Sequence, residues 1–219
     1  AESRGDTKQA IMLFEQILQD FPRNAEIYFI MYRIRMEQGR QDDADALIDA
    51  GIELTGGDVR LRMQRAAIAE REGDFDAAIE QYEAVFAAEP DSMIAANNLA
   101  STLSEHRADD PEQLARAKKI ALRLKGTDVP QMKDTVGWTL YLAGDYNEAL
   151  IYLLDAVKVL PNSALVNYHT GMTFVALGDM VQGRTYLERA LELAEGTAFP
   201  HFDTAQATLA DLPAETAVE

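Results

Sequence analysis

Three histidines are the residues of this sequence best suited to acid–base chemistry or to metal binding. They are His106, His169 and His201, and they lie far apart in the chain at no spacing typical of metal ligands. Catalysis by a nucleophile, a base and an orienting acid needs such groups to converge. An isolated histidine in a helical protein is more often a packing or surface residue than a base. The sequence therefore predicts no catalytic residue and no metal ligand among them.

The other residue types that carry chemistry lead to the same expectation. The chain has no cysteine, which excludes disulfides, cysteine-ligated zinc and thiol catalysis. The acidic pairs Asp42-Asp43 and Asp109-Asp110 lack the alternating oxygen ligands of a calcium loop. The glycines are spaced as turns rather than grouped in a phosphate-binding loop. We therefore expect no cofactor and no enzymatic activity in this chain.

Composition and charge limit the choice of partners. The 219 residues include 20 Lys and Arg against 37 Asp and Glu, a net charge of -17, and the hydrophobic content of 47% is that of an ordinary globular protein. Nucleic acid and anionic lipid both favour a dense Lys/Arg surface, so neither is an expected partner. No apolar run approaches the roughly 18 residues of a membrane span, so we expect no direct membrane insertion. The start at Ala1, without an initiator Met or a signal pattern, predicts a processed or cloned segment.

The residues that must position any site recur with a fixed period. Glycines stand 34 residues apart in two series (39 − 5, 73 − 39 and 178 − 144), and the interval between the series is twice 34 plus three (144 − 73 = 71). These glycines are Gly5, Gly39, Gly73, Gly144 and Gly178. The prolines Pro22, Pro90 and Pro161 carry the same three extra residues, so one insertion lies between Pro90 and Gly144. A period of this length is typical of stacked repeats.

Each period has the pattern of a helix, a turn and a second helix. A small residue stands five positions after each of these glycines and a bulky one nine positions after most of them, as in Ala78 and Tyr82. Residues three and four apart share one face of a helix. Glycine tolerates the left-handed conformation that ends a helix, and the Asp that follows it in four of the five cases can cap the next helix. Seven residues before the turn, small residues such as Gly137 and Gly171 predict a close approach of the two helices.

This pattern resembles the tetratricopeptide repeat (TPR). The clearest unit contains Val136-Gly137-Trp138, then Gly144-Asp145-Tyr146-Asn147-Glu148-Ala149, and ends at Pro161. The resemblance covers nearly the whole chain, from about residue 2 to about residue 197. It implies an all-α fold, a right-handed TPR superhelix, or α-solenoid, of antiparallel helix pairs. One repeat departs from the pattern, because Arg107 stands where a turn glycine is expected and a longer loop follows.

The repeat pattern divides the chain, taken as a single solenoid over residues 1–219, into repeats and end segments. These are a half repeat at 6–22, full repeats at 25–58, 59–92, 93–129, 130–163 and 164–197, a capping helix at 198–212 and a tail at 213–219. The unpaired helix of the half repeat leaves an apolar face uncovered. We expect that face to be covered by more of the native protein or by another chain, and self-association through it is one hypothesis.

The resemblance implies a concave groove lined by the first helix of each repeat. Candidate peptide-binding residues on this face mix cationic, small polar, apolar and aromatic side chains. They are Phe29, Arg33, Arg60, Met63, Asn97, Asn98, Ser101, Trp138, Tyr141, Tyr168 and Met172. For Trp138 and Tyr168 two interpretations stand equal: they anchor a ligand, or the capping helix or the adjacent repeat buries them. For Asn97 and Asn98 a structural role is favoured, because Asn is common there in the family.

The leading hypothesis is a non-catalytic scaffold that binds a peptide or protein segment in this groove. Carboxylate-clamp binding of acidic chaperone tails is disfavoured, because Met63 and Asp134 stand where such a clamp needs a base. Residues 134–138 (Asp-Thr-Val-Gly-Trp) resemble a sequence motif that is frequent in bacterial multi-repeat envelope proteins, including TPR lipoproteins of exopolysaccharide export and protein sorting. This resemblance implies a periplasmic or membrane-tethered scaffold, with a cytoplasmic adaptor as the alternative. A second hypothesis makes the chain the regulatory or substrate-recruiting arm of a larger enzyme whose catalytic domain lies outside these residues.

Overall fold

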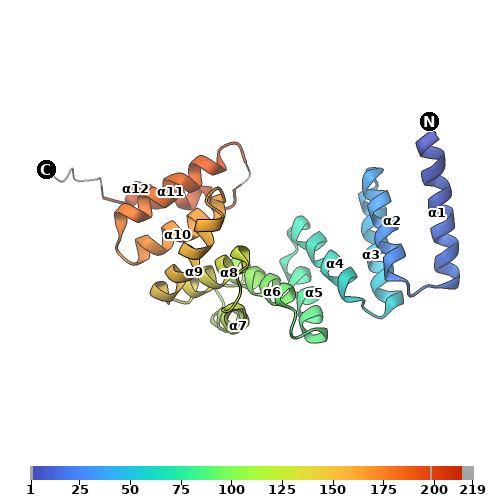
Figure 1. The fold of residues 1–219 in the computed structure, drawn as a ribbon, viewed down its shortest axis with the longest axis horizontal. Helices are drawn as coiled ribbons and strands as arrows, with labels where there is room; N and C mark the ends of the chain where they lie inside the picture. The colour runs from blue at the N-terminus through green and yellow to red at the C-terminus, as the bar shows by residue number, and fades with distance from the viewer. Residues whose placement is uncertain (1, 198, 214–219) are drawn as a thin grey trace. The chain divides into compact units, whose positions relative to one another are not determined.

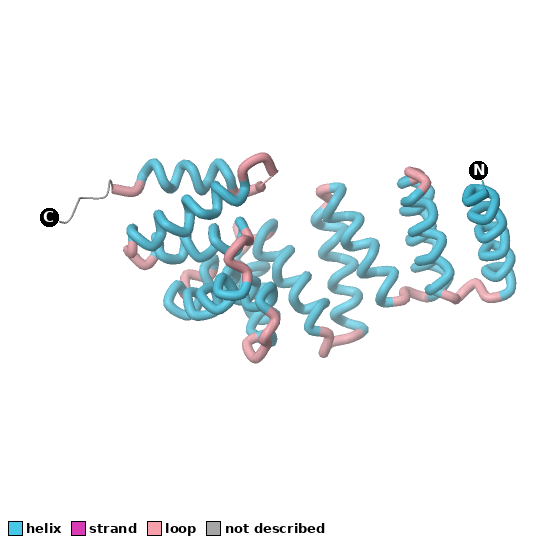
Figure 2. The backbone as a smooth tube through the Cα atoms, turned by 45° about the horizontal axis from the view of Figure 1, so that its top comes forward, coloured by secondary structure: helices cyan, strands magenta, loops and turns pink. Residues whose placement is uncertain are grey.

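The computed structural model describes residues 2–197 and 199–213. Within these ranges twelve α-helices and one short 3-10 helix follow one another, and there is no β-strand (Figures 1 and 2). The all-α fold predicted from the sequence is confirmed. By its internal contacts the chain forms two compact units, residues 1–95 (unit 1) and residues 96–219 (unit 2). The division falls inside a helix, at a point that no change of composition marks.

Unit 1 consists of paired helices around a core of aromatic and branched side chains. Its helices are α1 (Glu2–Asp20), α2 (Ala25–Glu37), α3 (Gln41–Thr55), α4 (Val59–Glu72), α5 (Phe75–Ala88) and the first residues of α6 (Met93–His106). Helix α2 packs against α3, and α4 packs against α5 and α3 (Figure 1). The buried side chains of Tyr28, Ile48, Leu61 and Ile68 form the centre of this core.

Unit 2 repeats the same construction and adds a helix at its C-terminal end. It contains the rest of α6, α7 (Pro111–Ala121), the 3-10 helix η1 (Leu122–Leu124), α8 (Pro130–Leu142), α9 (Tyr146–Val159), α10 (Ala164–Ala176), α11 (Met180–Ala194) and α12 (Phe202–Asp211). Helices α8 and α9 form one pair, α10 and α11 the next, and α12 packs against α11. The sequence places a capping helix at 198–212, and α12 lies within that range; most of the predicted tail, residues 214–219, lies outside the described residues.

The turn glycines behave as predicted at four of five positions. Gly39, Gly73, Gly144 and Gly178 all have φ values between 70° and 84°, in the left-handed region that closes a helix without a Cβ clash. The prediction is wrong for Gly5, which lies inside α1. Glycine can adopt helical dihedrals at a cost of about 1 kcal/mol relative to Ala, so α1 continues through it.

The aspartates that follow the turn glycines cap helices only in part. The carboxylate of Asp74 accepts a hydrogen bond from the backbone N–H of Ala77, and that of Asp179 accepts one from Gln182. Asp145 makes no capping bond, because its carboxylate instead pairs with the ammonium of Lys118. The prediction of an Asp cap is therefore confirmed after Gly73 and Gly178 and wrong after Gly144.

Glycines also set the separation of paired helices, as the repeat pattern predicts. A Cβ at Gly137 would lie 2.5 Å from Cγ of Leu153, and a Cβ at Gly171 would lie 2.8 Å from Cγ of Leu187. Both leucines stand at the bulky position nine residues after a turn glycine. The large side chain on the second helix thus fills the space left open on the first, which confirms the predicted close approach.

The loop at the predicted insertion is closed by a different capping arrangement. Asp110 accepts hydrogen bonds from the backbone N–H groups of Glu112 and Gln113, and Pro111 opens α7. Pro is suited to this first position because its missing N–H would have had no helical partner. Among the described residues, no helix is long and apolar enough to cross a membrane.

Candidate functional site

The predicted groove residues of unit 1 lie on an accessible face, which we call the unit 1 face and define by Phe29, Arg33, Arg60 and Met63. Phe29 and Arg33 belong to α2, and Arg60 and Met63 belong to α4, which contacts α2. The guanidinium carbon of Arg60 lies 6.0 Å from the centre of the Phe29 ring, a distance suited to cation–π attraction. The Arg60 side chain is 59% exposed, and so open to a ligand.

A hollow beside this face offers apolar contacts. It has a volume of about 350 Å³. Its lining is Val59, Arg60, Met63, Gln64, Val85, Glu89, Ser92 and Ile94. Ile94 is 60% exposed and lines the hollow together with Met63, so the two side chains form an apolar surface. The hollow is therefore suited to an apolar side chain of a partner.

Arg33 differs from the other arginines of α2 and α4. Each of those arginines has a carboxylate or an amide of the same unit as partner, in the pairs Arg35–Glu15, Arg60–Glu26, Arg62–Gln81, Arg65–Asp49 and Arg71–Asp45. Arg33 is exposed and has no ion pair or hydrogen bond from its side chain to any described residue. Its guanidinium can therefore donate hydrogen bonds to a carboxylate from outside the chain without breaking an internal contact.

The predicted groove residues on α6 are partly buried. The side-chain amide of Asn97 donates a hydrogen bond to the side-chain oxygen of Asn98, 3.3 Å away. Ser101 lines a cavity of about 330 Å³ in unit 2. The bond between Asn97 and Asn98 joins neighbouring residues of the same helix.

The aromatic residues predicted for the groove of unit 2 lie in a core. Trp138 is 7% exposed and Tyr168 is 3% exposed, and both pack with Leu187, Ala190 and Ala205. Phe199, Tyr141 and Met172 are partly buried against the same cluster. Since Ala205 belongs to α12, the capping helix helps to bury Trp138 and Tyr168. Side chains of α10 and α11, which form the adjacent repeat, pack in the same cluster and against Trp138.

A cluster of titratable side chains lies beside this core, drawn from three helices and one loop. It contains Glu105 on α6, Asp134 on α8, His169 on α10 and His201 just before α12, and we call it the histidine cluster. His169 Nδ1 lies 2.9 Å from Asp134 Oδ1, and His169 Nε2 lies 3.6 Å from Glu105 Oε1. His201 Nε2 lies 3.2 Å from the other oxygen of Glu105.

Burial and charge act in opposite directions on this cluster. Burial alone would lower the pKa of His169, but the charge and hydrogen bond of Asp134, with the contact to Glu105, raise that pKa to about 9. Burial alone would raise the pKa of Glu105, but the close contacts and charges of His169 and His201 lower it to about 2. Both groups are therefore held in their charged forms near neutral pH when no other cation is bound.

Aromatic rings hold both imidazoles in place. The ring of Trp138 stacks on that of His169, with centres 4.1 Å apart and planes 13° from parallel. The ring of Tyr168 stacks on that of His201, with centres 4.6 Å apart and planes 8° from parallel. Burial raises the pKa of the Tyr168 hydroxyl well above its ordinary value, so Tyr168 is neutral. The rings fix the orientation of the two histidines while adding no charge of their own.

The prediction that the histidines do not converge is wrong for His169 and His201. Their ligand atoms and that of Glu105 all lie within 4.8 Å of one another, so these three residues could hold a metal ion. His106 lies on the wall of the neighbouring cavity and is not part of the cluster. One sequence signal could have indicated the convergence: Asp134 and His169 are 35 residues apart, close to one repeat period, which stacks equivalent positions side by side.

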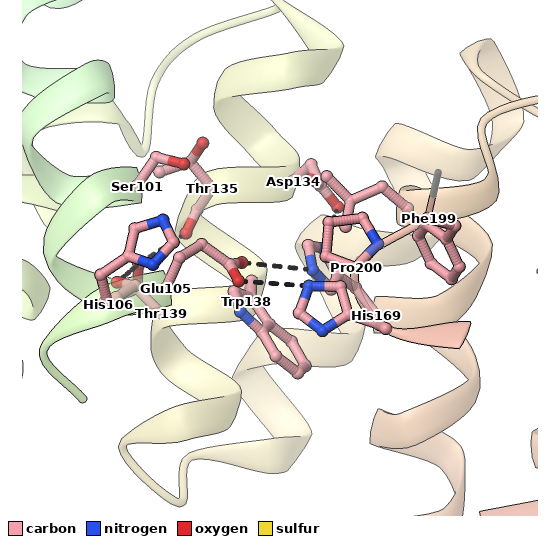
Figure 3. Close-up of a pocket in the computed structure, with 13 residues that line it drawn as sticks. Ser101, Glu105, His106, Asp134, Thr135, Trp138, Thr139, His169, Phe199 and Pro200 are labelled. Carbon is pink, nitrogen blue, oxygen red and sulfur yellow. Dashed lines mark hydrogen bonds and ion pairs between the residues drawn. The ribbon is translucent and has the colours of Figure 1, made fainter. Parts of the chain in front are cut away.

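The 330 Å³ cavity is lined by residues of α6, α8, α10 and the segment before α12, including the histidine cluster. Its lining combines polar and aromatic residues, with Phe199 and Pro200 at one side (Figure 3). The lining residues are Ser101, Ser104, Glu105, His106, Asp134, Thr135, Trp138, Thr139, Leu165, His169, Phe199, Pro200 and His201. The hydroxyls of Ser104 and Thr139 hydrogen-bond each other at 2.8 Å, which joins α6 to α8 at the cavity wall.

Known proteins match both the sequence and the fold of this chain. Two tetratricopeptide repeat models match, one over residues 1–68 and the other over residues 59–102. A TPR repeat-containing protein of Pseudomonas aeruginosa is 27% identical over 139 residues, which make up 63% of this chain and 23% of that protein. The match thus spans about a quarter of the length of the curated relative.

Solved structures with this fold include several TPR proteins. YrrB, described as a TPR protein with an unusual peptide-binding site, has a TM-score of 0.65 at 16% identity, over 89% of this chain and 96% of its own. A tetratricopeptide repeat protein of Parabacteroides merdae has a TM-score of 0.64 at 12% identity, over 95% and 93% of the two chains. MamA of Desulfovibrio magneticus reaches 0.62 at 14% identity, over 80% and 97%. At these identities the likeness concerns the fold alone.

The repeat pattern, the helix pairs, the family models and the shared fold agree with one another. TPR proteins are generally non-catalytic scaffolds whose partners are proteins or peptides. These findings support a tetratricopeptide repeat protein with an all-α TPR superhelix, a fold that supports a scaffold for protein–protein interaction.

Proposed function

We propose that this chain binds an extended segment of a partner protein on the unit 1 face. The observation that carries the proposal is a contrast in accessibility between two sets of equivalent residues. Arg33, Arg60 and the hollow beside Met63 are open, whereas Trp138 and Tyr168 are covered by α12 and the residues that precede it. A ligand can reach the first set without displacing part of the chain.

The side chains of the unit 1 face define the chemistry of the ligand. Met63 and Ile94 offer an apolar surface for one or two apolar side chains, at about 25 cal/mol for each Å² buried. Arg33 has no internal partner and suits a carboxylate. The net charge of -17 repels a long acidic run. The ligand we propose is therefore a mainly apolar segment with a single acidic side chain.

Selection of random peptides displayed on phage, with the purified chain as bait, tests this function. We expect enriched peptides to combine apolar residues with one acid, and to bind with a Kd that Arg33→Glu and Met63→Glu each weaken about tenfold or more. Arg23→Glu is the matched control, since Arg23 is an exposed arginine of the same unit outside the face. Absence of enrichment, or equal weakening by the control substitution, would contradict the proposal.

The place of action that we propose is the bacterial cell envelope. The resemblance of residues 134–138 to envelope TPR proteins supports it, as does a relative from a bacterium. Fractionation of the source cell is the test, with the protein expected in the periplasmic or membrane fraction; recovery only from the cytosol would contradict it. The sequence of the full-length gene tests the alternative hypothesis that this chain is the regulatory or substrate-recruiting arm of a larger enzyme. An adjoining transferase or kinase domain would support that alternative.

Self-association through the N-terminal half repeat is a separate proposal. Met12 and Leu13 on α1 are 60% and 59% exposed, while the other face of α1 packs through Ile11 on Ile27 and Met31 of α2. An exposed apolar pair on a helix surface favours contact with a second copy. Light scattering over a range of concentrations should detect dimers that Met12→Glu with Leu13→Glu abolishes. A strictly monomeric chain would contradict the proposal.

A further inference from the structure

We propose that Glu105, His169 and His201 bind a divalent transition-metal ion in unit 2. The site is separate from the unit 1 face and does not depend on the peptide-binding function. It would join three segments that are distant in sequence: the last turn of α6, the middle of α10 and the loop before α12. Two imidazoles and one carboxylate suit Zn²⁺, Fe²⁺ or Co²⁺ better than Mg²⁺ or Ca²⁺, which prefer oxygen ligands alone.

The distances between the ligand atoms agree with a shared ion. Two ligands bound to zinc at about 2.1 Å with a tetrahedral angle lie about 3.4 Å apart. In the cluster, Glu105 Oε1 lies 3.6 Å from His169 Nε2, and Glu105 Oε2 lies 3.2 Å from His201 Nε2. All three ligand atoms lie within 4.8 Å of one another. Only small movements of the side chains are needed to place one ion among them.

His169 gives an independent indication that a cation belongs here. Its side chain is 2% exposed, and its Nε2 atom has no hydrogen-bond partner among the described residues. The separation of 3.6 Å from Glu105 is too long for a hydrogen bond of ordinary geometry. A buried nitrogen without a bonded partner is incompletely satisfied. A metal ion between Nε2 and the carboxylate of Glu105 would supply that partner.

The surroundings of His169 are those of a metal-binding histidine. Asp134 accepts a hydrogen bond from Nδ1 at 2.9 Å, so Nε2, which faces Glu105, is the nitrogen that would bind a metal ion once its proton is displaced. Metal-bound histidines commonly donate their second N–H to a carboxylate in this way. Trp138 and Tyr168 stack on the two imidazoles and hold them in orientation. Asp134 is therefore a positioning residue for His169. The rings of Trp138 and Tyr168 position His169 and His201 by stacking on their imidazoles.

The cavity provides access and a further coordination position. Glu105, His169 and His201 all lie on the wall of the 330 Å³ cavity, which can admit the ion and a water molecule as fourth ligand. Because metal binding must displace the proton from His169, the affinity should fall as the pH falls. Bound metal would hold His201, and with it the start of α12, against α6 and α10.

Titration of the purified, tag-free chain with Zn²⁺ against a chromophoric chelator tests the proposal. We expect one ion per chain, and an affinity reduced about tenfold or more in Glu105→Gln and in His201→Ala. His106→Ala is the matched control, because His106 lines the same cavity without belonging to the cluster, and its affinity should equal that of the wild type. Absence of saturable binding, or wild-type affinity in His201→Ala, would overturn the proposal.

A second measurement separates metal binding from a purely structural ion pair. Zn²⁺ should raise the melting temperature of the wild type and of His106→Ala, and leave that of folded His201→Ala unchanged, because a ligand that binds only the native state stabilises it. Circular dichroism tests whether His201→Ala is folded. If it is unfolded, the visible absorption of Co²⁺ bound to the wild type and to His106→Ala tests metal coordination instead. An equal rise in all three proteins, or no tetrahedral Co²⁺ spectrum, would overturn the proposal and leave Glu105 as an ion-pair partner only.

Discussion

Equivalent helix faces of the two units differ in solvent exposure. Arg33 in unit 1 and Trp138 in unit 2 both stand six residues before a turn glycine (39 − 33 and 144 − 138). Arg33 is exposed, whereas Trp138 is 7% exposed and packed against the cluster that includes α12. Position in the repeat thus determines the direction of the side chain, and what lies over the face determines whether the residue belongs to a core or to a binding surface.

The largest effect should come from removing the aromatic pair that distinguishes the covered face. Trp→Ala substitutions in a core cost about 3–5 kcal/mol, so Trp138→Ala with Tyr168→Ala should strongly reduce the free energy of unfolding. The matched pair in unit 1, Phe29→Ala with Met63→Ala, should cost less because both residues are only partly buried. Urea unfolding followed by circular dichroism measures both. Equal costs would remove the contrast between the faces.

A somewhat smaller effect should follow from filling the gap between α8 and α9. In Gly137→Leu the new side chain would meet Leu153, whose Cγ lies 2.5 Å from the position of a Cβ, and overpacking of this kind costs about 1–3 kcal/mol or more. Gly126→Ala is the control, since a Cβ there meets nothing within 4 Å. The melting temperature should fall for Gly137→Leu alone. An unchanged value would count against the repeat register from which the comparison is drawn.

The repeat register was predictable from the sequence, because it depends on local chemistry that recurs. A left-handed glycine at Gly144 and a gap at Gly137 filled by Leu153 both follow from residue size and backbone freedom at fixed offsets. Gly5 shows the limit of this reasoning: glycine permits a turn without enforcing one, and α1 runs through it.

The histidine cluster was not predictable in the same way. His201 lies outside the repeats, so no period connects it to Glu105, and only the path of the loop before α12 brings the two together. Ala205 of α12 is likewise one of the residues in the cluster that buries Trp138, together with side chains of α10 and α11. The repeat pattern therefore located the turns and the helix contacts, whereas His201, which a terminal segment places, could not be located from it.

A pH effect should be confined to unit 2, because all three histidines of the chain lie there. In chelator-treated protein the pKa of His169 rises from 6.5 to about 9, owing to Asp134 and Glu105 despite its burial. Protonated His169 then stabilises the folded state by at most about 3 kcal/mol. This contribution to the free energy of unfolding is complete below pH 6.5 and is lost as the pH rises through 9. Trp138, the single tryptophan, reports unfolding of unit 2 by fluorescence.

The control for this pH effect is Asp134→Asn, which removes the first charge that raises the pKa of His169. Its dependence on alkaline pH should be weaker than that of the wild type. The low pKa of Glu105, about 2, acts at the opposite end: its contribution is present above pH 4.5 and is lost as the pH falls toward 2. A wild-type stability that stays level from pH 6.5 to pH 9 would contradict the assignment of charge in the cluster.

The smallest effect on stability should come from Arg33→Ala, at the position equivalent to Trp138. Arg33 is exposed and has no side-chain partner among the described residues, so the free energy of unfolding should change by less than about 0.5 kcal/mol. Arg65→Ala is a useful counterpart, because Arg65 on the same helix as Arg60 pairs with Asp49 at 3.0 Å and Glu72 at 3.5 Å. Equilibrium urea unfolding of both variants gives the comparison. A loss at Arg33 larger than that at Arg65 would mean that the unit 1 face is held together by this arginine, and the open surface on which peptide binding rests would have to be abandoned.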